Sequence, residues 1–483
     1  MKDGRDIKLV FHSRLTYELH IDVGEATASL PPSRRSIVFP VPAHLVKGRK
    51  LDFRLGDGRR SVVYTVRVLR SSSLPRGVGA TGSVASDEKR PLIARPSSAA
   101  STRARLWSSS SRPHQPLRLV YSRIDDDEED NGGELHVLVL AARDPSTWLG
   151  SVPSSSSLSL LCLPGSHETL ARYGWPFSQC QNTESTVAKQ LEDGIRFMDI
   201  RLRPRGEKGK ERLLAYHGSV DERIEFSAVL EQVWAFLEGP GKQETLVMSV
   251  KQEGGDQDTF INLLKTAYVD ATPPPANDAS PTAPRGRQRW FLENRVPTLG
   301  EVRGKIVLFS RFVIDPKFDF PGGISPPIWP DSYEGCFDYK LPTGQAVQTQ
   351  DWYHIGSLSS IPRKFELICD LMDQGGRDPS TLALDFCNGS SVPWALPPSV
   401  AKGWLDDGSI VQRCSTLLAT RGVNPRLRDR VADIMAAASS SYPQEKKLHQ
   451  ALDGLMVTFA IDFYAEPAAA SDLVPLLIEA NFQ

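Results

Sequence analysis

From about residue 150 onward, the chain alternates short apolar, β-rich runs with segments of helical period. This alternation is typical of a parallel α/β arrangement, because a crossover segment must carry the chain back between two parallel strands. Several runs are apolar and β-branched enough to be buried on both faces of a sheet. The predicted strands are LSLLCLPG (158–165), IRFMDIRL (195–202), LLAYHGS (213–219), ETLVMSV (244–250), KIVLFSRF (305–312), QTQDWYHI (348–355), TLALDFC (381–387) and MVTFAIDFY (456–464).

The clearest predicted helix is EFSAVLEQVWAFLEG, in which Phe226, Val229, Leu230, Val233 and Leu237 mark one apolar stripe. Eight strands with intervening helices over roughly 330 residues fit an irregular TIM (β/α)8-type barrel, because some connections are poor in helix. The predicted fold class is therefore α/β, with the barrel spanning residues 146–483. The proline-rich segment near 270–286 is predicted to be a surface insertion.

Residues 1–145 have a different character. The runs IKLVFHS, YELHIDV and SVVYTVRVL alternate apolar and polar residues between turn signals. Residues 71–114 are rich in serine, arginine, proline and glycine and predict a disordered insert, because few large apolar side chains are present to offset the entropy of ordering. RLVYSRI and ELHVLVLAA flank the acidic run DDDEEDNGG and predict a further strand pair. A small all-β domain containing this insert is expected to precede the barrel.

The chain carries 57 Lys and Arg against 58 Asp and Glu, a formal net charge of −1. This balance provides no global field that would attract nucleic acid or an anionic bilayer. The first residues are too charged for a signal peptide and no long apolar run follows, so we expect a cytoplasmic protein, peripheral at membranes, without a transmembrane segment. Six cysteines without a CxxC pair predict neither a disulfide framework nor a structural zinc site.

Ionisable side chains gather at the carboxyl ends of the predicted strands, where a barrel places its reactive groups. Each one alone fits a surface ion pair or a capping residue. Together, at seven of the eight strands, they predict a polar ligand site, because a water-excluding barrel mouth does not otherwise tolerate so many charges. They are His167 and Glu168, Asp199 and Arg201, His217, Lys251 and Glu253, Arg311, Asp351 and Tyr353, and Asp462.

The motifs around these residues resemble a known family. LCLPGSHETL resembles the IPGTHDS motif of the phosphatidylinositol phospholipase C X domain, and FMDIRLR resembles its FDIRGR strand. AYHG, VMSVKQE, KIVLFSRF and VQTQDWY match later motifs in the same order, and the tail FAIDFYAEPAAASDLVPLLIEANF resembles the closing strand and helix. Over about residues 145–483 the chain is therefore similar to the bacterial-type enzymes with a single X domain.

The resemblance implies cleavage of phosphatidylinositol, or of a glycosylated form, to diacylglycerol and inositol 1,2-cyclic phosphate. Two histidines suit this reaction, because the inositol 2-hydroxyl must lose a proton and the diacylglycerol oxygen must gain one. By similarity, His167 is the general base and His217 is the general acid. Arg201 would bind the phosphoryl oxygens, and Asp462 would orient His167.

The resemblance also assigns the inositol ring to Lys251, Glu253, Arg311, Asp351 and Tyr353. A ring of hydroxyls needs charged hydrogen-bond partners and an aromatic face, and the acidic groups disfavour further phosphates on it. The expected partner is phosphatidylinositol in a membrane that the protein contacts transiently, with no nucleic acid. The partner of the β domain is not indicated.

Two residues depart from the family's pattern. Glu168 stands where aspartate or asparagine is usual, and its extra methylene could re-aim the hydrogen bond that supports His217. Asp199 is followed two positions later by Arg201, whereas calcium-dependent relatives have an acidic pair on this strand. Because a guanidinium can neutralise the phosphate in place of a cation, we expect catalysis without calcium or another cofactor.

Other functions remain open. A catalytically weakened X domain that binds phosphoinositides or acts as a scaffold is favoured by Glu168 and disfavoured by the two histidines. A metal-dependent glycerophosphodiester phosphodiesterase would need an acidic cluster where Arg201 stands. A Ser-His-Asp hydrolase would need a GxSxG turn, which the sequence lacks. Trp175 fits either an interfacial membrane anchor or a buried packing residue.

Overall fold

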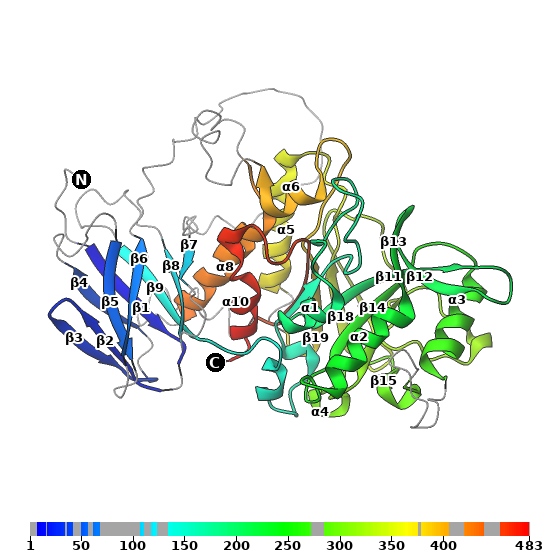
Figure 1. Ribbon diagram of the computed structural model, residues 1–483, viewed down its shortest axis with the longest axis horizontal. Helices are drawn as coiled ribbons and strands as arrows, with labels where there is room; N and C mark the ends of the chain where they lie inside the picture. Colours follow the sequence, from blue (N-terminus) through cyan, green and yellow to red (C-terminus); the bar gives the residue numbers. More distant parts are fainter. Residues whose placement is uncertain are drawn as a thin grey trace.

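The structure, a computed structural model (Figure 1), describes residues 7–15, 17–33, 36–41, 50–56, 61–67, 107–110, 117–122, 134–271, 285–374, 378–404, 420–438 and 455–482. Most of the predicted insert 71–114, the acidic run 125–133 and most of the proline-rich segment 270–286 lie outside these residues. Within them, no helix has the length and apolar character needed to cross a bilayer.

The amino-terminal strands form two sheets, coloured blue to cyan in Figure 1. Their strand orders are β4-β1-β9-β8-β7 and β3-β2-β5-β6. β1 and β9 pair in parallel, and the other neighbours pair antiparallel. One hydrophobic cluster, which includes Leu9, Phe53 and Val137, draws residues from both sheets. The strands are β1 (Ile7–Ser13), β2 (Leu19–Val23), β3 (Ala26–Leu30), β4 (Ser36–Val41), β5 (Lys50–Gly56), β6 (Ser61–Arg67), β7 (Trp107–Ser110), β8 (Leu117–Ser122) and β9 (Glu134–Ala141).

Strand β7 corrects the predicted extent of the disordered insert. Trp107–Ser110 lies inside the predicted segment 71–114 but pairs antiparallel with β8, with Ser108 opposite Tyr121. The scarcity of large apolar residues does not prevent this strand, because an edge strand is held by its backbone ladder and needs few apolar side chains.

The second half of the chain is built on a mostly parallel sheet, with the order β15-β16-β14-β11-β10-β22-β19-β18-β17. All neighbours are parallel except β17 and β18. The strands are β10 (Leu163–Ser166), β11 (Phe197–Arg205), β14 (Leu246–Gln252), β15 (Trp290–Phe291), β16 (Ile306–Arg311), β17 (Cys336–Lys340), β18 (Ala346–Gln350), β19 (Thr381–Phe386) and β22 (Val457–Ile461). The α/β class is confirmed. In the described part of the chain, no pairing joins β16 to β17 or β18.

The third predicted strand is not a parallel strand of this sheet. β12 (Arg212–His217) pairs antiparallel with the second half of β11 and with β13 (Val220–Glu225). β11 is long enough to continue beyond the sheet, and the chain turns back along it as a hairpin. His217 therefore returns toward the edge where the parallel strands end, although its strand runs in the opposite direction.

Helices cover the parallel sheet (Figure 1). The predicted helix is confirmed as α2 (Phe226–Glu238), and the five residues of its predicted stripe are buried. The other α-helices are α1 (Val187–Glu192), α3 (Gln257–Leu263), α4 (Leu299–Val302), α5 (Ile361–Gln374), α6 (Pro397–Lys402), α8 (Val423–Ala438) and α10 (Leu473–Glu479). Shorter elements are η3 (Trp148–Ser151), η4 (Leu158–Leu160), η5 (Leu264–Val269), η7 (Arg287–Arg289), η8 (Pro316–Phe318), η9 (Leu358–Ser360), η11 (Ala468–Ala470), β20 (Gly403–Trp404) and β21 (Thr420–Arg421).

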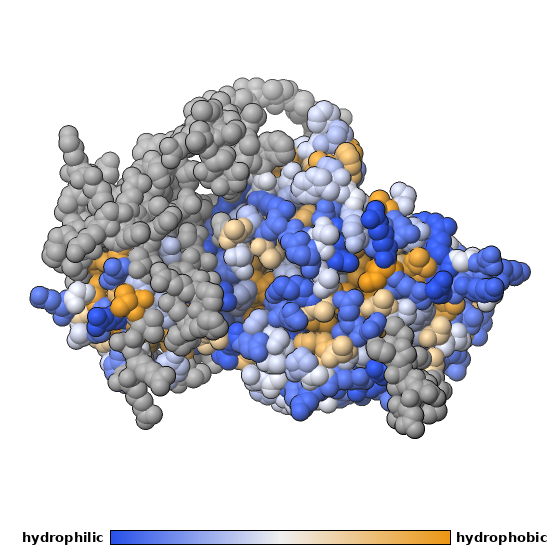
Figure 2. Space-filling model, viewed as in Figure 1, coloured by the Kyte–Doolittle hydropathy of each residue, from blue (hydrophilic) through white to orange (hydrophobic). Residues whose placement is uncertain are grey.

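The amino-terminal sheets pack against the carboxyl-terminal helices, with β9 against α8. Leu138 and Leu140 of β9 belong to the hydrophobic cluster of the larger unit. Arg143 Nε lies 2.7 Å from Glu479 Oε1, and the Arg143 guanidinium lies 3.6 Å from the centroid of the Phe482 ring. On the face shown in Figure 2, the apolar residues of the described segments form separate patches among hydrophilic ones.

Candidate functional site

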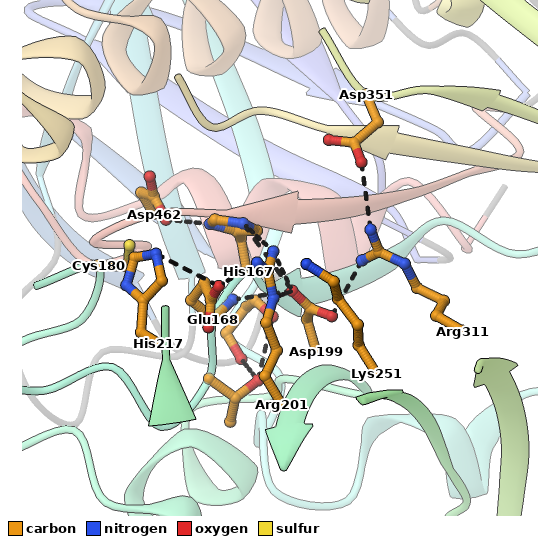
Figure 3. Close-up of polar contacts among 12 residues, drawn as sticks. His167, Glu168, Cys180, Asp199, Arg201, His217, Lys251, Arg311, Asp351 and Asp462 are labelled. Atoms are coloured by element: carbon orange, nitrogen blue, oxygen red, sulfur yellow. Dashed lines mark hydrogen bonds and ion pairs between the residues drawn. The ribbon is translucent and has the colours of Figure 1, made fainter. Parts of the chain in front are cut away.

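A pocket of about 760 Å³ opens at the carboxyl ends of the parallel strands. Nine of the eleven predicted site residues line it: His167, Arg201, His217, Lys251, Glu253, Arg311, Asp351, Tyr353 and Asp462. The other two, Glu168 and Asp199, are buried and contact Arg201. The structure therefore brings all eleven residues together, as Figure 3 shows for most of them.

His167 directly follows β10 and is only 4% exposed. Its Nδ1 lies 2.7 Å from Asp462 Oδ1, and its Nε2 lies 3.0 Å from Arg201 Nη2. A guanidinium can only donate hydrogen bonds, so Nε2 must accept and the ring proton must reside on Nδ1, where it is donated to Asp462. Burial, followed by the charge of Arg201, lowers the pKa of His167. The imidazole is therefore neutral, with its free electron pair on Nε2.

Arg201 is held by two carboxylates. Its guanidinium forms an ion pair with Glu168, and its Nε and Nη2 each lie 3.2 Å from Asp199 Oδ2. Burial alone would raise the pKa of Asp199, but Arg201 and Arg311 hold it below the usual value. Burial raises the pKa of Glu168, against the opposing effect of Arg201. The arginine thus lies between two acidic groups, within reach of the pocket.

The backbone at Glu168 is strained. Its φ of 43° lies in the left-handed region, which costs a non-glycine residue on the order of 1–3 kcal/mol. Two hydrogen bonds to Asp199 hold this turn: the Glu168 N–H donates to Oδ2 at 3.3 Å, and the Thr169 N–H donates to the backbone carbonyl at 2.9 Å. The conformation places the Glu168 carboxylate between Arg201 and His217 (Figure 3).

His217, at the end of β12, lines the pocket and contacts Glu168. Its Nε2 lies 3.4 Å from Glu168 Oε1, and its Nδ1 donates to the Ser178 carbonyl at 2.7 Å. The sequence could not identify Ser178, because a backbone carbonyl carries no residue signature. Cys180, two residues later, also lines the pocket without having been predicted.

Arg311 connects Asp199 to Asp351 across the pocket. Its Nη1 lies 3.2 Å from Asp199 Oδ1, and its Nη2 lies 3.3 Å from Asp351 Oδ2. The Arg311 guanidinium also lies 4.0 Å from the centroid of the Trp329 ring, and Trp329 Nε1 donates to Asp351 at 2.9 Å. Sequence reasoning missed Trp329, which belongs to a loop and not to a predicted strand.

The remaining ring-binding candidates also line the pocket. Lys251 Nζ lies 3.1 Å from Glu253 Oε2. Tyr353 donates its hydroxyl to Asp331 at 2.5 Å, and burial raises the pKa of this hydroxyl to about 12. Charged groups and aromatic rings therefore both line the pocket, a composition suited to a hydroxyl-rich ligand.

The fold and the site define a class of protein. It is an α/β protein with two histidines and an arginine in one pocket at the carboxyl ends of its strands. Residues 166–312 match the family model described as phosphatidylinositol-specific phospholipase C, X domain. Residues 166–312 are therefore similar to this X domain, and the resemblance in the sequence motifs is confirmed.

Curated relatives support this assignment. The 1-phosphatidylinositol phosphodiesterase of Listeria monocytogenes is 31% identical over 221 residues, which cover 42% of this chain and 62% of the relative. The enzyme of the same name from Staphylococcus aureus strain Newman is 26% identical over 183 residues, covering 35% of this chain and 52% of the relative. The chain thus spans less than two thirds of the length of these relatives.

A solved structure of the Staphylococcus aureus phosphatidylinositol-specific phospholipase C superposes with a TM-score of 0.51. The match covers 70% of this chain and 98% of the other at 19% sequence identity. At this identity the comparison supports the fold, and the function must be argued from the site.

Proposed function

We propose that this protein cleaves phosphatidylinositol, or a glycosylated form of it, to diacylglycerol and inositol 1,2-cyclic phosphate. The observation that carries the proposal is the placement of His167 and His217 in one pocket with Arg201, which contacts His167 directly and reaches His217 through Glu168. A pure binding module has no need of two imidazoles facing one anion-binding arginine.

In the proposed reaction, His167 Nε2 accepts the proton of the inositol 2-hydroxyl while that oxygen attacks phosphorus. The bond from phosphorus to the glycerol oxygen breaks, and protonated His217 gives its Nε2 proton to the leaving oxygen. Arg201, which contacts His167 Nε2 at 3.0 Å, would turn its donors toward the phosphoryl oxygens. Asp462 stabilises the imidazolium that forms at His167.

We propose that Lys251, Glu253, Arg311, Asp351 and Tyr353 bind the inositol ring. Lys251 and Arg311 are each paired with a carboxylate, so little positive charge is left for additional ring phosphates. This favours a ring with free hydroxyls over a phosphorylated one.

Catalysis is proposed to proceed without calcium. Glu168 and Asp199 could otherwise serve as oxygen ligands of a cation, but both are paired with the Arg201 guanidinium. Arg201 supplies the positive charge near the phosphate that a metal ion would supply in a calcium-dependent enzyme.

Transient membrane contact is proposed to involve apolar side chains near the pocket. Val313 lines the pocket and is 63% exposed, and Ile328 lies between two lining residues, Pro327 and Trp329. Trp175 is also 63% exposed, so the alternative of a buried packing role for it is wrong. Exposed tryptophan and aliphatic side chains suit the headgroup region of a bilayer.

For the architecture, we propose an irregular barrel that lacks strand pairing between β16 and β17, preceded by a separate domain of residues 1–145. The two hydrophobic clusters support this division.

The test is incubation of the purified protein with phosphatidylinositol vesicles in excess EDTA, with cyclic inositol phosphate followed by phosphorus NMR. His167→Ala and His217→Ala should each lower the rate by a factor of about 100 or more. His20→Ala is the matched control, because His20 pairs with Ser29 in the amino-terminal sheets. Absence of product with EDTA and with calcium would contradict the enzyme proposal and favour a binding or scaffold role. A rate that requires calcium would contradict only the metal-free mechanism.

A further inference from the structure

The proposed reaction gives no role to the thiol of Cys180, although this thiol lies beside two residues of the site. It is 1% exposed, yet it belongs to the wall of the pocket. A ring nitrogen of His167, the Cys180 sulfur and a carboxylate oxygen of Asp462 all lie within 4.8 Å of one another, and Nδ1 is the ring nitrogen that faces Asp462. The other cysteines of the described residues, Cys162, Cys336, Cys369 and Cys387, take part in no such cluster.

We propose that His167, Cys180 and Asp462 bind a thiophilic divalent cation such as Zn²⁺, and that this binding switches the site off. The three donors are an imidazole nitrogen, a thiolate sulfur and a carboxylate oxygen, a set that suits zinc and not calcium or magnesium. All three residues line the pocket, so a cation can enter from it and keep its fourth position open toward the pocket.

The distances require only small side-chain movements. In a tetrahedral zinc site with the usual bond lengths, donor atoms are separated by about 3.3–3.7 Å. His167 Nδ1 and Asp462 Oδ1 are 2.7 Å apart in their hydrogen bond, so they would separate by less than about 1 Å. The sulfur, at no more than 4.8 Å from the other donors, would move closer by a similar amount.

The balance of protons and charge explains the inhibition. Metal binding at Nδ1 requires a free electron pair there, so the ring proton moves from Nδ1 to Nε2. The thiol proton is released to solvent. One dication then neutralises the thiolate and the carboxylate. With its proton on Nε2, His167 can no longer accept the proton of the inositol hydroxyl, and this last step rests on the proposed function.

A second cluster, made of His167, Glu168 and Asp199, also has metal-ligand spacing. Its two carboxylates are paired with Arg201. A cation there would have to displace the guanidinium from both carboxylates, whereas at Cys180 it costs only the thiol proton and the single contact between Arg201 and His167 Nε2. The inferred site is also compatible with the lack of a CxxC pair, because its three ligands come from separate segments of the chain.

Cobalt spectroscopy tests binding without relying on activity. Chelator-treated protein is titrated with Co²⁺, and one equivalent should produce a thiolate-to-cobalt charge-transfer band that Zn²⁺ abolishes. Cys180→Ser should lose the band, whereas Cys387→Ser, the matched buried control, should keep it. If wild-type protein binds Co²⁺ without a thiolate band, the proposal is overturned even when Cys180→Ser does not fold.

Inhibition is measured in the phosphatidylinositol assay. Zn²⁺ should inhibit wild-type protein reversibly, with recovery on adding EDTA, and Cys180→Ser should need about tenfold more Zn²⁺ or higher. Equal sensitivity of both proteins would overturn the inference while leaving the proposed function intact. A thiolate band in a protein without activity would instead support the metal site and contradict the proposed function.

Discussion

Asp462→Asn is the change that most directly tests the assignment of His167 as a base. Asp462 accepts the Nδ1 proton at 2.7 Å and is buried. An asparagine amide at this place would donate to Nδ1 and force the ring proton to Nε2, where it would face the donors of Arg201. The mutation therefore removes the basic nitrogen from the pocket without changing the shape of the residue.

The expected loss of activity follows from two contributions. A hydrogen bond to a charged group contributes about 1.5–3 kcal/mol, which corresponds to roughly 10- to 150-fold in rate. The equivalent change in a Ser-His-Asp triad, which removes this hydrogen bond and also imposes the wrong tautomer, costs about 10⁴-fold in total. We therefore expect kcat to fall by about 10²- to 10⁴-fold, with a much smaller change in KM.

The assay is steady-state release of cyclic inositol phosphate in EDTA, together with thermal melting to verify folding. Asp385→Asn is the matched control. Burial raises the pKa of Asp385 to about 8, so this carboxyl is protonated at neutral pH and an amide resembles it closely. It contacts Gln350 and lies outside the pocket wall. If Asp462→Asn folds and keeps more than half of the wild-type kcat, the assignment of base and tautomer is refuted.

Three further changes test other parts of the molecule. Arg201→Lys should lower kcat by about 10²- to 10³-fold in the same assay, because one ammonium cannot bridge Glu168, Asp199 and a phosphoryl oxygen. A loss below fivefold would argue against the proposal that Arg201 binds the phosphate. Burial raises the pKa of Glu222 from 4.5 to about 7, so native protein binds this proton more tightly than unfolded protein does. Its contribution to stability is present below pH 4.5 and is lost as pH rises to about 7, by at most about 3 kcal/mol. Glu222→Gln keeps an acceptor for the Arg172 and Tyr173 N–H groups. It should flatten the dependence of Tm on pH between pH 5 and 8, because the glutamine does not titrate. Parallel curves of Tm against pH for the wild type and the variant would contradict this prediction. Trp175→Ala should weaken binding to phosphatidylinositol vesicles by about tenfold in a sedimentation assay. Leu160→Ala is the control, because Leu160 is exposed and precedes β10, and it should not weaken binding. Equal binding of both variants would show that Trp175 takes no part in the membrane contact.

The sequence by itself indicated the α/β class, the stripe of α2 and most residues of the site. It could do so because the carboxyl ends of parallel strands meet at one edge, so ionisable residues after separate strands converge. His167, Arg201, Arg311 and Asp462 were found in this way, and the order of the family's motifs reinforced the prediction.

Only the tertiary structure decided which element carries His217 and what holds it. A run such as LLAYHGS has the same composition in a parallel strand and in a hairpin, and the choice depends on β11 extending far enough to pair with it. The Ser178 carbonyl accepts a hydrogen bond from His217 because of the conformation of its loop, and no residue type in the sequence predicts that conformation. Glu168, whose length was the main uncertainty in the sequence, contacts both Arg201 and His217 because its strained backbone places it between them.

The grouping of Cys180 with His167 and Asp462 is likewise a tertiary feature. The three residues lie on segments far apart in the chain, so their spacing in the sequence resembles no metal motif. Side-chain type and strand order specify which groups reach the pocket. The loops and the hairpin determine which atoms are in contact, and the tautomer of His167 depends on those contacts.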